Sequence, residues 1–425
     1  MENYNILQVS TSDGNGGSES VTKQLAVKYR ELGHNSWVAV GRKESNDPNI
    51  FKIDNDNQKY RRFDGIAKRF LAHRLGRECF YFPGTSHMLD LLPTKPDIIH
   101  CHNLHGDYFD LRELPHFSLE TPVILTLHDA WLLAGHCAHS FDCERWKSGC
   151  GNCPRLDIYP PLERDATAEN IKKKHEIFSR CRLYITSPAK WIVDKAMQSI
   201  LQEAVIEAQV IPNGINTTIY KPTDKQRAKA ELSNKVPINK DDAVLLFAAN
   251  GIRNNIFKDY KTLRDAIPKI QKGINRRVVF IALGEDAPSE QIDGATIYFV
   301  PFEKDPVQVA KYYQAADVYL HAAHAEVWNL TIGEALACGT PVVATAVGGI
   351  PEQIQDGVNG YLVAHKDSNE MAKCTIHLLT NDNTREEMGK NASTIIQNNF
   401  TIDIQVDRYL KFYEKIIQHD KHIYK

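Results

Sequence analysis

The chain has no long hydrophobic segment and no marked excess of charge of either sign. None of its apolar runs approaches the roughly 18 residues that a membrane-spanning helix needs. Its first residues, MENYNILQVSTS, have neither the basic segment nor the apolar stretch of a secretory signal. The formal net charge of −2 does not indicate a nucleic-acid partner. We therefore expect a cytoplasmic protein that binds no nucleic acid.

Two familiar motifs are also missing. The loop DGNGGSE (13–19) follows the first predicted strand, but the dinucleotide-binding pattern G-x-G-x-x-G fails at Glu19. The end of the second predicted strand, which reads SWVAVGRK, has no acidic residue at the place where that pattern would need one. The second half of the chain has no Asp-x-Asp motif that could hold a divalent cation on a diphosphate. These absences disfavour a dehydrogenase and predict that no catalytic metal is required.

Short β-branched or apolar runs alternate with amphipathic segments along the chain, as in parallel sheets with crossover helices. A length of 425 residues favours two domains over one. The runs are 5–10, 36–40, 97–102, 123–128, 183–187 and 208–213, then 243–248, 277–284, 295–300, 317–322 and 341–346. We predict an α/β protein with two doubly wound, Rossmann-like domains that bind ligands at the carboxyl ends of their strands.

A polar stretch separates the two halves. Residues 216–242 include Pro222 and Pro237, and we interpret them as the hinge side of the second domain. We therefore expect an N-terminal domain over 1–215 and a C-terminal domain over 216–399. The tail 402–418 has the pattern of a helix.

The most informative segment is EVWNLTIGEALACGTPVVATAVGGIPEQIQDGVNGYLV (326–363). Asn329 is a good helix N-cap, the run LTIGEALAC after it is compatible with a helix, and a glycine and a proline end it. Glu326 then lies on the entering loop and Glu334 just over one turn inside the helix. Backbone N–H groups at a helix start favour phosphate, and two carboxylates beside them can bind sugar hydroxyls. The predicted nucleotide-sugar site comprises Glu326, Asn329, Leu330, Thr331 and Glu334.

This segment resembles the signature of glycosyltransferase family four: Glu-x7-Glu, then Ala-Cys-Gly-Thr-Pro-Val-Val-Ala, then Gly-Gly-Ile-Pro-Glu. The family consists of retaining enzymes of the GT-B fold, in which two Rossmann-like domains face a central cleft. The resemblance implies that Glu326 acts on the donor sugar and that Glu334 holds the ribose. It also implies an acceptor-side N-terminal domain, a nucleotide-sugar-binding C-terminal domain, and a C-terminal helix (400–420) that packs back on the first domain.

A pair of basic residues supports a diphosphate ligand. The segment GIRNNIFKDY (251–260) follows a predicted strand and places Arg253 and Lys258 five apart on a loop. There they can converge on one diphosphate and stabilise a leaving nucleoside diphosphate without a metal ion. The family's arrangement is Gly-Arg-x4-Lys-Gly, and Asp259 replaces its last glycine here. Two solvated loop cations are the alternative interpretation.

The N-terminal half contributes fewer candidates. Gly16 and Gly17 allow the backbone to approach a donor closely, and relatives carry Gly-Gly here. His128 ends the predicted strand 123–128. A lone histidine is more often structural, but the resemblance implies that the histidine of a strand-terminal His-Asp pair reaches the donor sugar. His100 and His102 alternate on a predicted buried strand, so we do not favour a metal site there.

Four of the nine cysteines gather in HCAHSFDCERWKSGCGNCP (136–154). Without an export signal, nine cysteines favour reduced thiols or a metal site over disulfides. Cys150 and Cys153 form a Cys-x2-Cys pair, whereas Cys137 and Cys143 are spaced more widely than zinc ligands usually are. Similar cysteines occur in a branch of the family that resembles colanic-acid-type polysaccharide enzymes. We predict a structural zinc ion bound by these four residues, with free thiols as the alternative.

These observations predict a retaining hexosyltransferase that needs no catalytic cofactor. It would move a sugar from a nucleoside-diphosphate sugar to a glycan, lipid-linked or small-molecule acceptor. A GT-B-like nucleotide-sugar epimerase and a non-enzymatic zinc-binding interaction protein are the alternatives. The basic segment RRFDGIAKRFLAHRLGR (61–77) contains interspersed apolar residues. It predicts either peripheral contact with the inner face of an anionic membrane or an ordinary surface helix.

Overall fold

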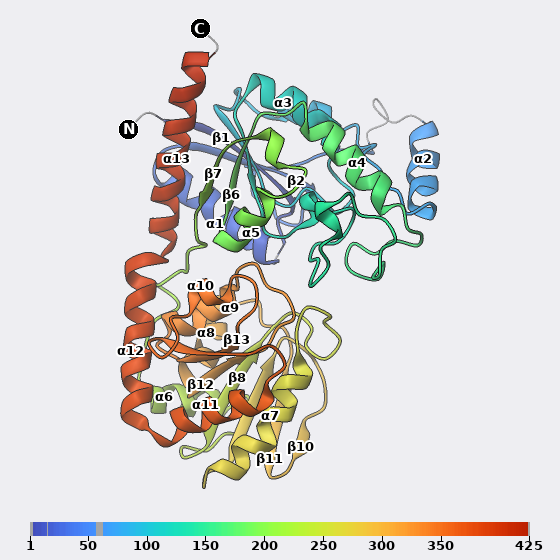
Figure 1. The fold of residues 1–425 in the computed structure, drawn as a ribbon. Coiled ribbons are helices and arrows are strands. Elements are labelled where there is room, and N and C mark those ends of the chain that lie inside the picture. The colour runs from blue at the N-terminus through green and yellow to red at the C-terminus, as the bar shows by residue number, and fades with distance from the viewer. Residues whose placement is uncertain (1–2, 15, 57–62, 424–425) are drawn as a thin grey trace. The chain divides into compact units, whose positions relative to one another are not determined.

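The computed structural model describes residues 3–14, 16–56 and 63–423. The chain forms two compact units. The N-terminal unit contains the residues up to Pro212 and those from Gln405 onward, and the C-terminal unit runs from Asn213 to Ile404. Each unit has a wholly or mostly parallel sheet with helices packed against it (Figure 1). Among the described helices, none combines the length and the apolar character that crossing a bilayer requires.

The N-terminal unit contains a seven-stranded sheet in the order β3-β2-β1-β4-β5-β6-β7, and each neighbouring pair is parallel. The strand order reverses between β1 and β4, which is where doubly wound sheets bind ligands. The strands are β1 (Asn5–Ser12), β2 (Asn35–Arg42), β3 (Ile50–Lys52), β4 (Ile98–Cys101), β5 (Val123–Thr126), β6 (Leu183–Ser187) and β7 (Val205–Val210). The helices are α1 (Gly17–Glu31), α2 (Phe63–Arg74), α3 (Leu114–Glu120), α4 (Thr167–Phe178), α5 (Lys190–Ala196) and α13 (Ile402–Ile423).

Helix α13 is held to this sheet by buried polar contacts as well as by apolar packing. The Tyr413 hydroxyl lies 2.7 Å from His100 Nδ1, and His100 Nε2 lies 2.6 Å from Thr126 Oγ1. His100 is fully buried in β4, a strand covered on both faces as is usual in parallel sheets. Its two ring nitrogens therefore have partners within the protein, and the histidine has a structural role.

The C-terminal unit contains a second seven-stranded sheet in the order β10-β11-β9-β8-β12-β13-β14, antiparallel only between β10 and β11. The strands are β8 (Ala243–Ala248), β9 (Val278–Leu283), β10 (Glu290–Ile292), β11 (Ala295–Val300), β12 (Val318–His321), β13 (Val342–Thr345) and β14 (Gly360–Val363). The helices are α6 (Lys225–Leu232), α7 (Tyr260–Gly273), α8 (Pro306–Ala315), α9 (Leu330–Ala337), α10 (Ile350–Gln353), α11 (Ser368–Thr380) and α12 (Asp382–Asn399).

Successive side chains of β8 point to opposite faces of the sheet and belong to two separate hydrophobic cores of this unit. Val244 and Leu246 pack with residues of α6, α8, α9 and α12 on one face. Leu245 and Phe247 pack with residues of α7 and α11 on the other. Because successive side chains of a strand point to opposite faces, a continuous apolar run is needed to bury both. This doubly covered sheet is the α/β architecture that the sequence predicted.

Candidate functional site

Glu326 and Glu334 lie on either side of the start of α9, as the sequence predicted. Asn329 caps the helix, and its side-chain oxygen accepts a hydrogen bond from the backbone N–H of Ile332 at 3.0 Å. Thr331 Oγ1 lies 2.6 Å from the buried Tyr319 hydroxyl of β12. The first backbone N–H groups of a helix have no partner within it, so Leu330 and Thr331 are placed where an anion is favoured.

Glu326 is paired with a lysine and approached by a histidine. Its side chain is 16 % exposed, forms an ion pair with Lys258 and lies 3.6 Å from His321 Nε2. Burial alone would raise the pKa of this carboxyl, but Lys258 and a hydrogen bond from His321 hold the pKa well below its usual range. Glu326 is therefore ionised at neutral pH. His321 and the ion pair were not predicted.

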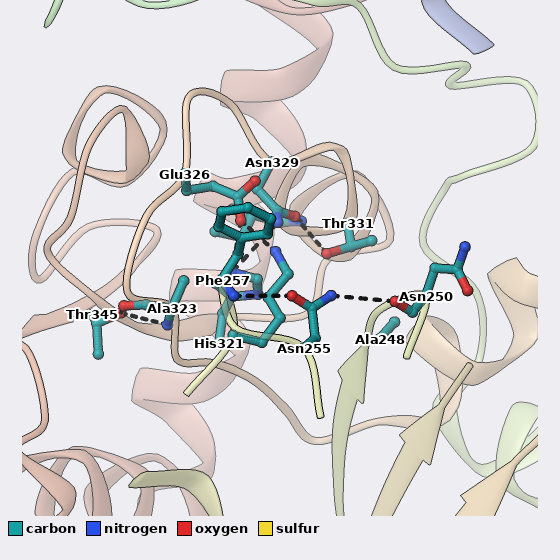
Figure 2. Close-up of polar contacts among 12 residues, drawn as sticks. Ala248, Asn250, Asn255, Phe257, His321, Ala323, Glu326, Asn329, Thr331 and Thr345 are labelled. Carbon is teal, nitrogen blue, oxygen red and sulfur yellow. Dashed lines mark hydrogen bonds and ion pairs between the residues drawn. The ribbon is translucent and has the colours of Figure 1, made fainter. Parts of the chain in front are cut away.

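The loop that carries Lys258 is held in place by Asn255 (Figure 2). The Asn255 side chain donates to the Asn250 carbonyl at 3.3 Å and accepts from the Phe257 backbone N–H at 3.0 Å. Lys258 also pairs with Ala323 in an antiparallel β-bridge. Backbone contacts thus place the ammonium group beside Glu326, although 68 residues separate the two in sequence.

Arg253 has a different partner from Lys258. Its Nε lies 2.5 Å from Glu285 Oε1, and its guanidinium lies over the Phe299 ring, 5.0 Å from the centroid. Both basic residues line one open cavity of about 500 Å³. Their convergence on a single diphosphate stays a prediction, because each cation is engaged by its own carboxylate.

Glu334 lies among tyrosines rather than cations. The Tyr313 hydroxyl donates to its carboxylate at 2.8 Å, and Tyr220 also hydrogen-bonds to it. Burial raises the pKa of Glu334 to about 7, although both tyrosines lower it. The sequence contained no signal for these two aromatic partners, which come from α8 and from the start of the C-terminal unit.

Two glycines after β13 bring the backbone close to Glu326. Gly348 has a φ of +54°, and a Cβ atom there would lie 1.9 Å from the Glu326 carbonyl oxygen. The neighbouring Gly349 donates its backbone N–H to that same oxygen at 3.1 Å. The Gly-Gly-Ile-Pro-Glu part of the motif therefore supports the loop that carries Glu326.

In the N-terminal unit, Gly16 is the N-cap of α1 and Gly17 is its first residue. A Cβ atom at Gly17 would meet nothing within 4 Å, whereas one at Gly16 would contact the Glu19 carboxylate at 2.1 Å. Residue 15, between them and the end of β1, lies outside the described residues. The space above Gly17 is compatible with the close approach predicted for a ligand.

His128 follows β5 and belongs to a buried hydrogen-bond chain. Its Nε2 lies 2.9 Å from His102 Nδ1, and His102 Nε2 lies 3.1 Å from Gln8 Oε1. Burial lowers the pKa of His128 to about 4, so the ring is neutral near pH 7. Asp129 does not orient His128, because its carboxylate lies 2.7 Å from His105 Nε2 instead.

The predicted zinc site is not supported. Cys137, Cys143, Cys150 and Cys153 are free thiols that line one small cavity. In the described part of the chain, however, no three of these sulfurs lie within 4.8 Å of one another. A tetrahedral zinc with Zn–S bonds of about 2.3 Å needs sulfurs roughly 3.8 Å apart. Gly149 and Gly151 have the positive φ of a tight turn, and the four thiols lie around one cavity, but their sulfurs are spaced too widely to bind a shared ion.

The family of the chain follows from two sequence models that together span most of it. The model of Glycosyltransferase Family 4 matches residues 15–219, and that of Glycosyl transferases group 1 matches residues 228–394. The chain belongs to glycosyltransferase family four. The second match includes Glu326, Glu334, Arg253 and Lys258.

Curated relatives and solved structures agree with this assignment. The chain is 23 % identical over 361 residues to a protein of Escherichia coli (strain K12) named as a colanic acid biosynthesis glycosyl transferase, WcaC, covering 80 % of this chain and 83 % of the relative. It is 26 % identical over 240 residues to N-acetyl-alpha-D-glucosaminyl L-malate synthase of Bacillus anthracis, covering 54 % and 61 %.

Similar folds occur in sucrose-phosphate synthase from Thermosynechococcus elongatus, with a TM-score of 0.68 at 16 % identity over 98 % of this chain and 100 % of that one. Anabaena Alr3699/HepE in complex with UDP and glucose has a TM-score of 0.66 at 16 % identity over 97 % and 99 %. The glycosyltransferase thus has the predicted GT-B fold. These relatives support neither the epimerase nor the zinc-binding interaction protein.

Proposed function

We propose that this enzyme transfers a sugar from a nucleoside-diphosphate sugar with retention of anomeric configuration. The observation that carries the proposal is the placement of two carboxylates with opposite electrostatics around the start of α9. Glu326 is ionised beside Lys258, and Glu334 lies among tyrosine hydroxyls with a pKa of about 7. A donor with a diphosphate between two sugars presents hydroxyls to both carboxylates and negative charge to the helix start.

At the sugar end, Glu326 accepts hydrogen bonds from hydroxyls of the donor sugar and so orients that sugar. At the diphosphate, Lys258, the amides of Leu330 and Thr331, and Arg253 stabilise the charge that develops as the nucleoside diphosphate leaves. Arg253 would exchange Glu285 for phosphate, and its exposed position makes that exchange inexpensive. This electrostatic stabilisation takes the place of a catalytic metal ion.

At the nucleoside end, Glu334 accepts hydrogen bonds from the ribose hydroxyls. Only the ionised carboxylate can accept a hydrogen bond on each of its oxygens. The nucleotide therefore binds more tightly when Glu334 has lost its proton. In the complex of Anabaena Alr3699/HepE the ligands are UDP and glucose. We infer that a uridine or similar nucleoside diphosphate binds here too.

In the N-terminal unit, we assign His128 to the donor sugar and Gly16 and Gly17 to close backbone approach. A neutral His128 ring can donate or accept one hydrogen bond, which suits a sugar hydroxyl. With retention, the acceptor hydroxyl attacks on the face that the nucleotide leaves, and the departing phosphate can take its proton. The acceptor is a glycan, a lipid-linked sugar or a small molecule.

We further propose peripheral membrane contact through α2, which would bring a lipid-linked acceptor to this unit. Phe70 and Leu71 are 66 % and 58 % exposed, and Arg69 and Arg74 lie on the same helix. Exposed apolar residues beside arginines favour the headgroup region of an anionic membrane. Residues 61 and 62 of the predicted basic segment lie outside the described residues.

Product analysis tests the proposed function. The purified protein is incubated with uridine-, guanosine- and adenosine-diphosphate sugars, with and without oligosaccharide and lipid-linked acceptors. We expect free nucleoside diphosphate to form with one donor only when an acceptor is present, and NMR of the product to show the anomeric configuration of that donor. An inverted product contradicts retention, and nucleoside-diphosphate sugars converted without any acceptor contradict transfer.

A further inference from the structure

Three side chains with no part in the proposed transfer come together in the C-terminal unit: Asp259, His324 and His365. One carboxylate oxygen and one nitrogen of each imidazole all lie within 4.8 Å of one another. His324 Nδ1 lies 2.7 Å from His365 Nε2 and 3.9 Å from Asp259 Oδ2. We call these three residues the His-Asp cluster.

We propose that the His-Asp cluster binds a divalent transition-metal ion of the zinc type through two imidazoles and one carboxylate. Ligands about 2.0–2.1 Å from a tetrahedral zinc ion are roughly 3.3 Å apart. The distances of 2.7 Å and 3.9 Å lie on either side of that value, and each differs from it by about 0.6 Å, a change that side-chain rotation can supply. Imidazole and carboxylate are ligands that zinc and its neighbours in the first transition row accept.

Backbone pairing holds two of the three ligands in place. Asp259 donates its backbone N–H to the Ala322 carbonyl at 3.0 Å, and His324 donates its own to the Phe257 carbonyl at 2.9 Å. The Asp259 carboxylate is buried and also caps α7, accepting from the Thr262 hydroxyl at 2.6 Å. Hydrogen bonds of this kind orient metal ligands and strengthen binding.

One of the three ligands also sets this chain apart from the family pattern. Asp259 replaces the glycine of the Arg-x4-Lys-Gly arrangement, and a glycine could supply no ligand at this position.

A bound ion would join the loops before α7 and after β12 to the turn after β14. These are the loops that carry Lys258 and Glu326, but neither residue is a ligand. The ion would therefore stabilise the C-terminal unit, and two of its ligands, Asp259 and His324, line the cavity that also contains Arg253 and Lys258.

Cobalt(II) alone is the probe that separates this site from the four cysteines. Metal-free full-length protein is titrated with Co²⁺, first unmodified and then as His365→Ala, Asp259→Asn and the double serine variant of Cys150 and Cys153. His116→Ala, an exposed histidine on α3, is the matched control. Asp259→Asn keeps an oxygen to cap α7, and His365 is exposed, so both variants should fold.

We expect one equivalent of Co²⁺ to bind with visible d–d bands and without the near-ultraviolet thiolate charge-transfer band. Affinity should fall at least 100-fold in His365→Ala and in Asp259→Asn, because even outer partners of metal ligands are worth 10–100-fold. It should be unchanged in His116→Ala and in the cysteine variant. Absence of binding, unchanged affinity in His365→Ala, or thiolate bands lost with the cysteines would each overturn the proposal.

Discussion

The two glutamates of the motif differ in their surroundings, and this difference sets their chemistry. Glu326 stays ionised because Lys258 is beside it, whereas Glu334 has only hydroxyl partners and a pKa of about 7. Pairs of carboxyl groups whose pKa values are pushed apart by their surroundings commonly have separate roles. At the scale of single residues, we therefore expect the two side chains to affect different steps.

Replacing Glu334 by glutamine should mainly weaken nucleoside-diphosphate binding. We expect a loss of about 1.5–3 kcal/mol, because hydrogen bonds between ribose hydroxyls and a charged acceptor are lost. Affinity for the unmodified enzyme should rise between pH 6 and pH 8 as Glu334 ionises, and the variant should show no such rise. Isothermal titration calorimetry across this pH range measures both effects. An identical pH profile in the variant would exclude Glu334 as the titrating group.

The same substitution should change the pH dependence of stability. The pKa of Glu334 is raised in the folded protein from 4.5 to about 7, so its contribution to folding is complete below about 4.5 and is lost as pH rises through about 7. The difference corresponds to roughly 3 kcal/mol at most. The free energy of unfolding of Glu334→Gln, measured in urea, should therefore increase relative to that of the unmodified protein between pH 5 and pH 8. A difference between the two proteins that does not change with pH would contradict the raised pKa.

Glu326→Gln should lower turnover and leave the binding of free nucleoside diphosphate nearly unchanged. The reason is that Glu326 is assigned to the donor sugar, which the free nucleotide lacks. Steady-state kinetics and calorimetry on one preparation separate the two quantities. If nucleotide affinity falls as much as turnover, the carboxylate belongs to the nucleotide end of the site.

Arg253→Ala and Lys258→Ala should weaken the binding of donor and nucleoside diphosphate far more than that of nucleoside, because both are assigned to phosphate. Lys261→Ala, an exposed lysine on the first turn of α7, is the matched control and should change neither. We expect Lys258→Ala to destabilise the fold as well, since it leaves the largely buried Glu326 without its cation. An equal loss of affinity for nucleoside would show that these two side chains do not act on the phosphate groups.

At the scale of elements, the turn after β13 should position Glu326. Gly348→Ala places a Cβ atom against the Glu326 carbonyl oxygen, so we expect the loop to shift and turnover to fall at least tenfold. Gly357→Ala is the control, because its φ of +75° carries a similar backbone cost but no heavy atom lies within 4 Å. Equal effects of the two substitutions on turnover would show that strain, not contact with Glu326, is responsible.

The strands that the sequence predicted and those that it missed differ in position. All eleven predicted runs contain strands, although β7 begins three residues earlier than expected. The missed strands, β3, β10 and β14, are each the outermost strand of a sheet. An edge strand has one neighbour and needs no continuous apolar run, so a stretch of three or four residues has little signal in the sequence.

The residues of the site were easier to predict than their contacts. The cap at Asn329 and the position of Glu334 follow from local helix rules and were confirmed. The pairing of Lys258 with Glu326 depends on a β-bridge between distant segments, and that of Glu334 with Tyr313 on packing between α8 and α9. Local spacing carries no information on either contact. The same holds for the four cysteines, whose predicted zinc site is not supported.

At the scale of the whole molecule, transfer should not depend on a divalent cation. A chelator should leave the initial rate of transfer unchanged, because cations of the protein stabilise the leaving group. The same treatment should lower the melting temperature of protein loaded at the His-Asp cluster, since an ion bound only to the folded state stabilises it. Activity that returns only when magnesium or manganese is added would contradict the metal-free mechanism.

The central claim is that the C-terminal unit binds a nucleoside-diphosphate sugar between Glu326 and Glu334. Calorimetric titration of the enzyme and of Glu334→Gln with a panel of uridine-, guanosine- and adenosine-diphosphate sugars tests it most directly. We predict that one donor binds the unmodified enzyme at pH 8 and binds the variant at least tenfold more weakly. Binding of no donor, or of the same donor with equal affinity to both proteins, would contradict the account.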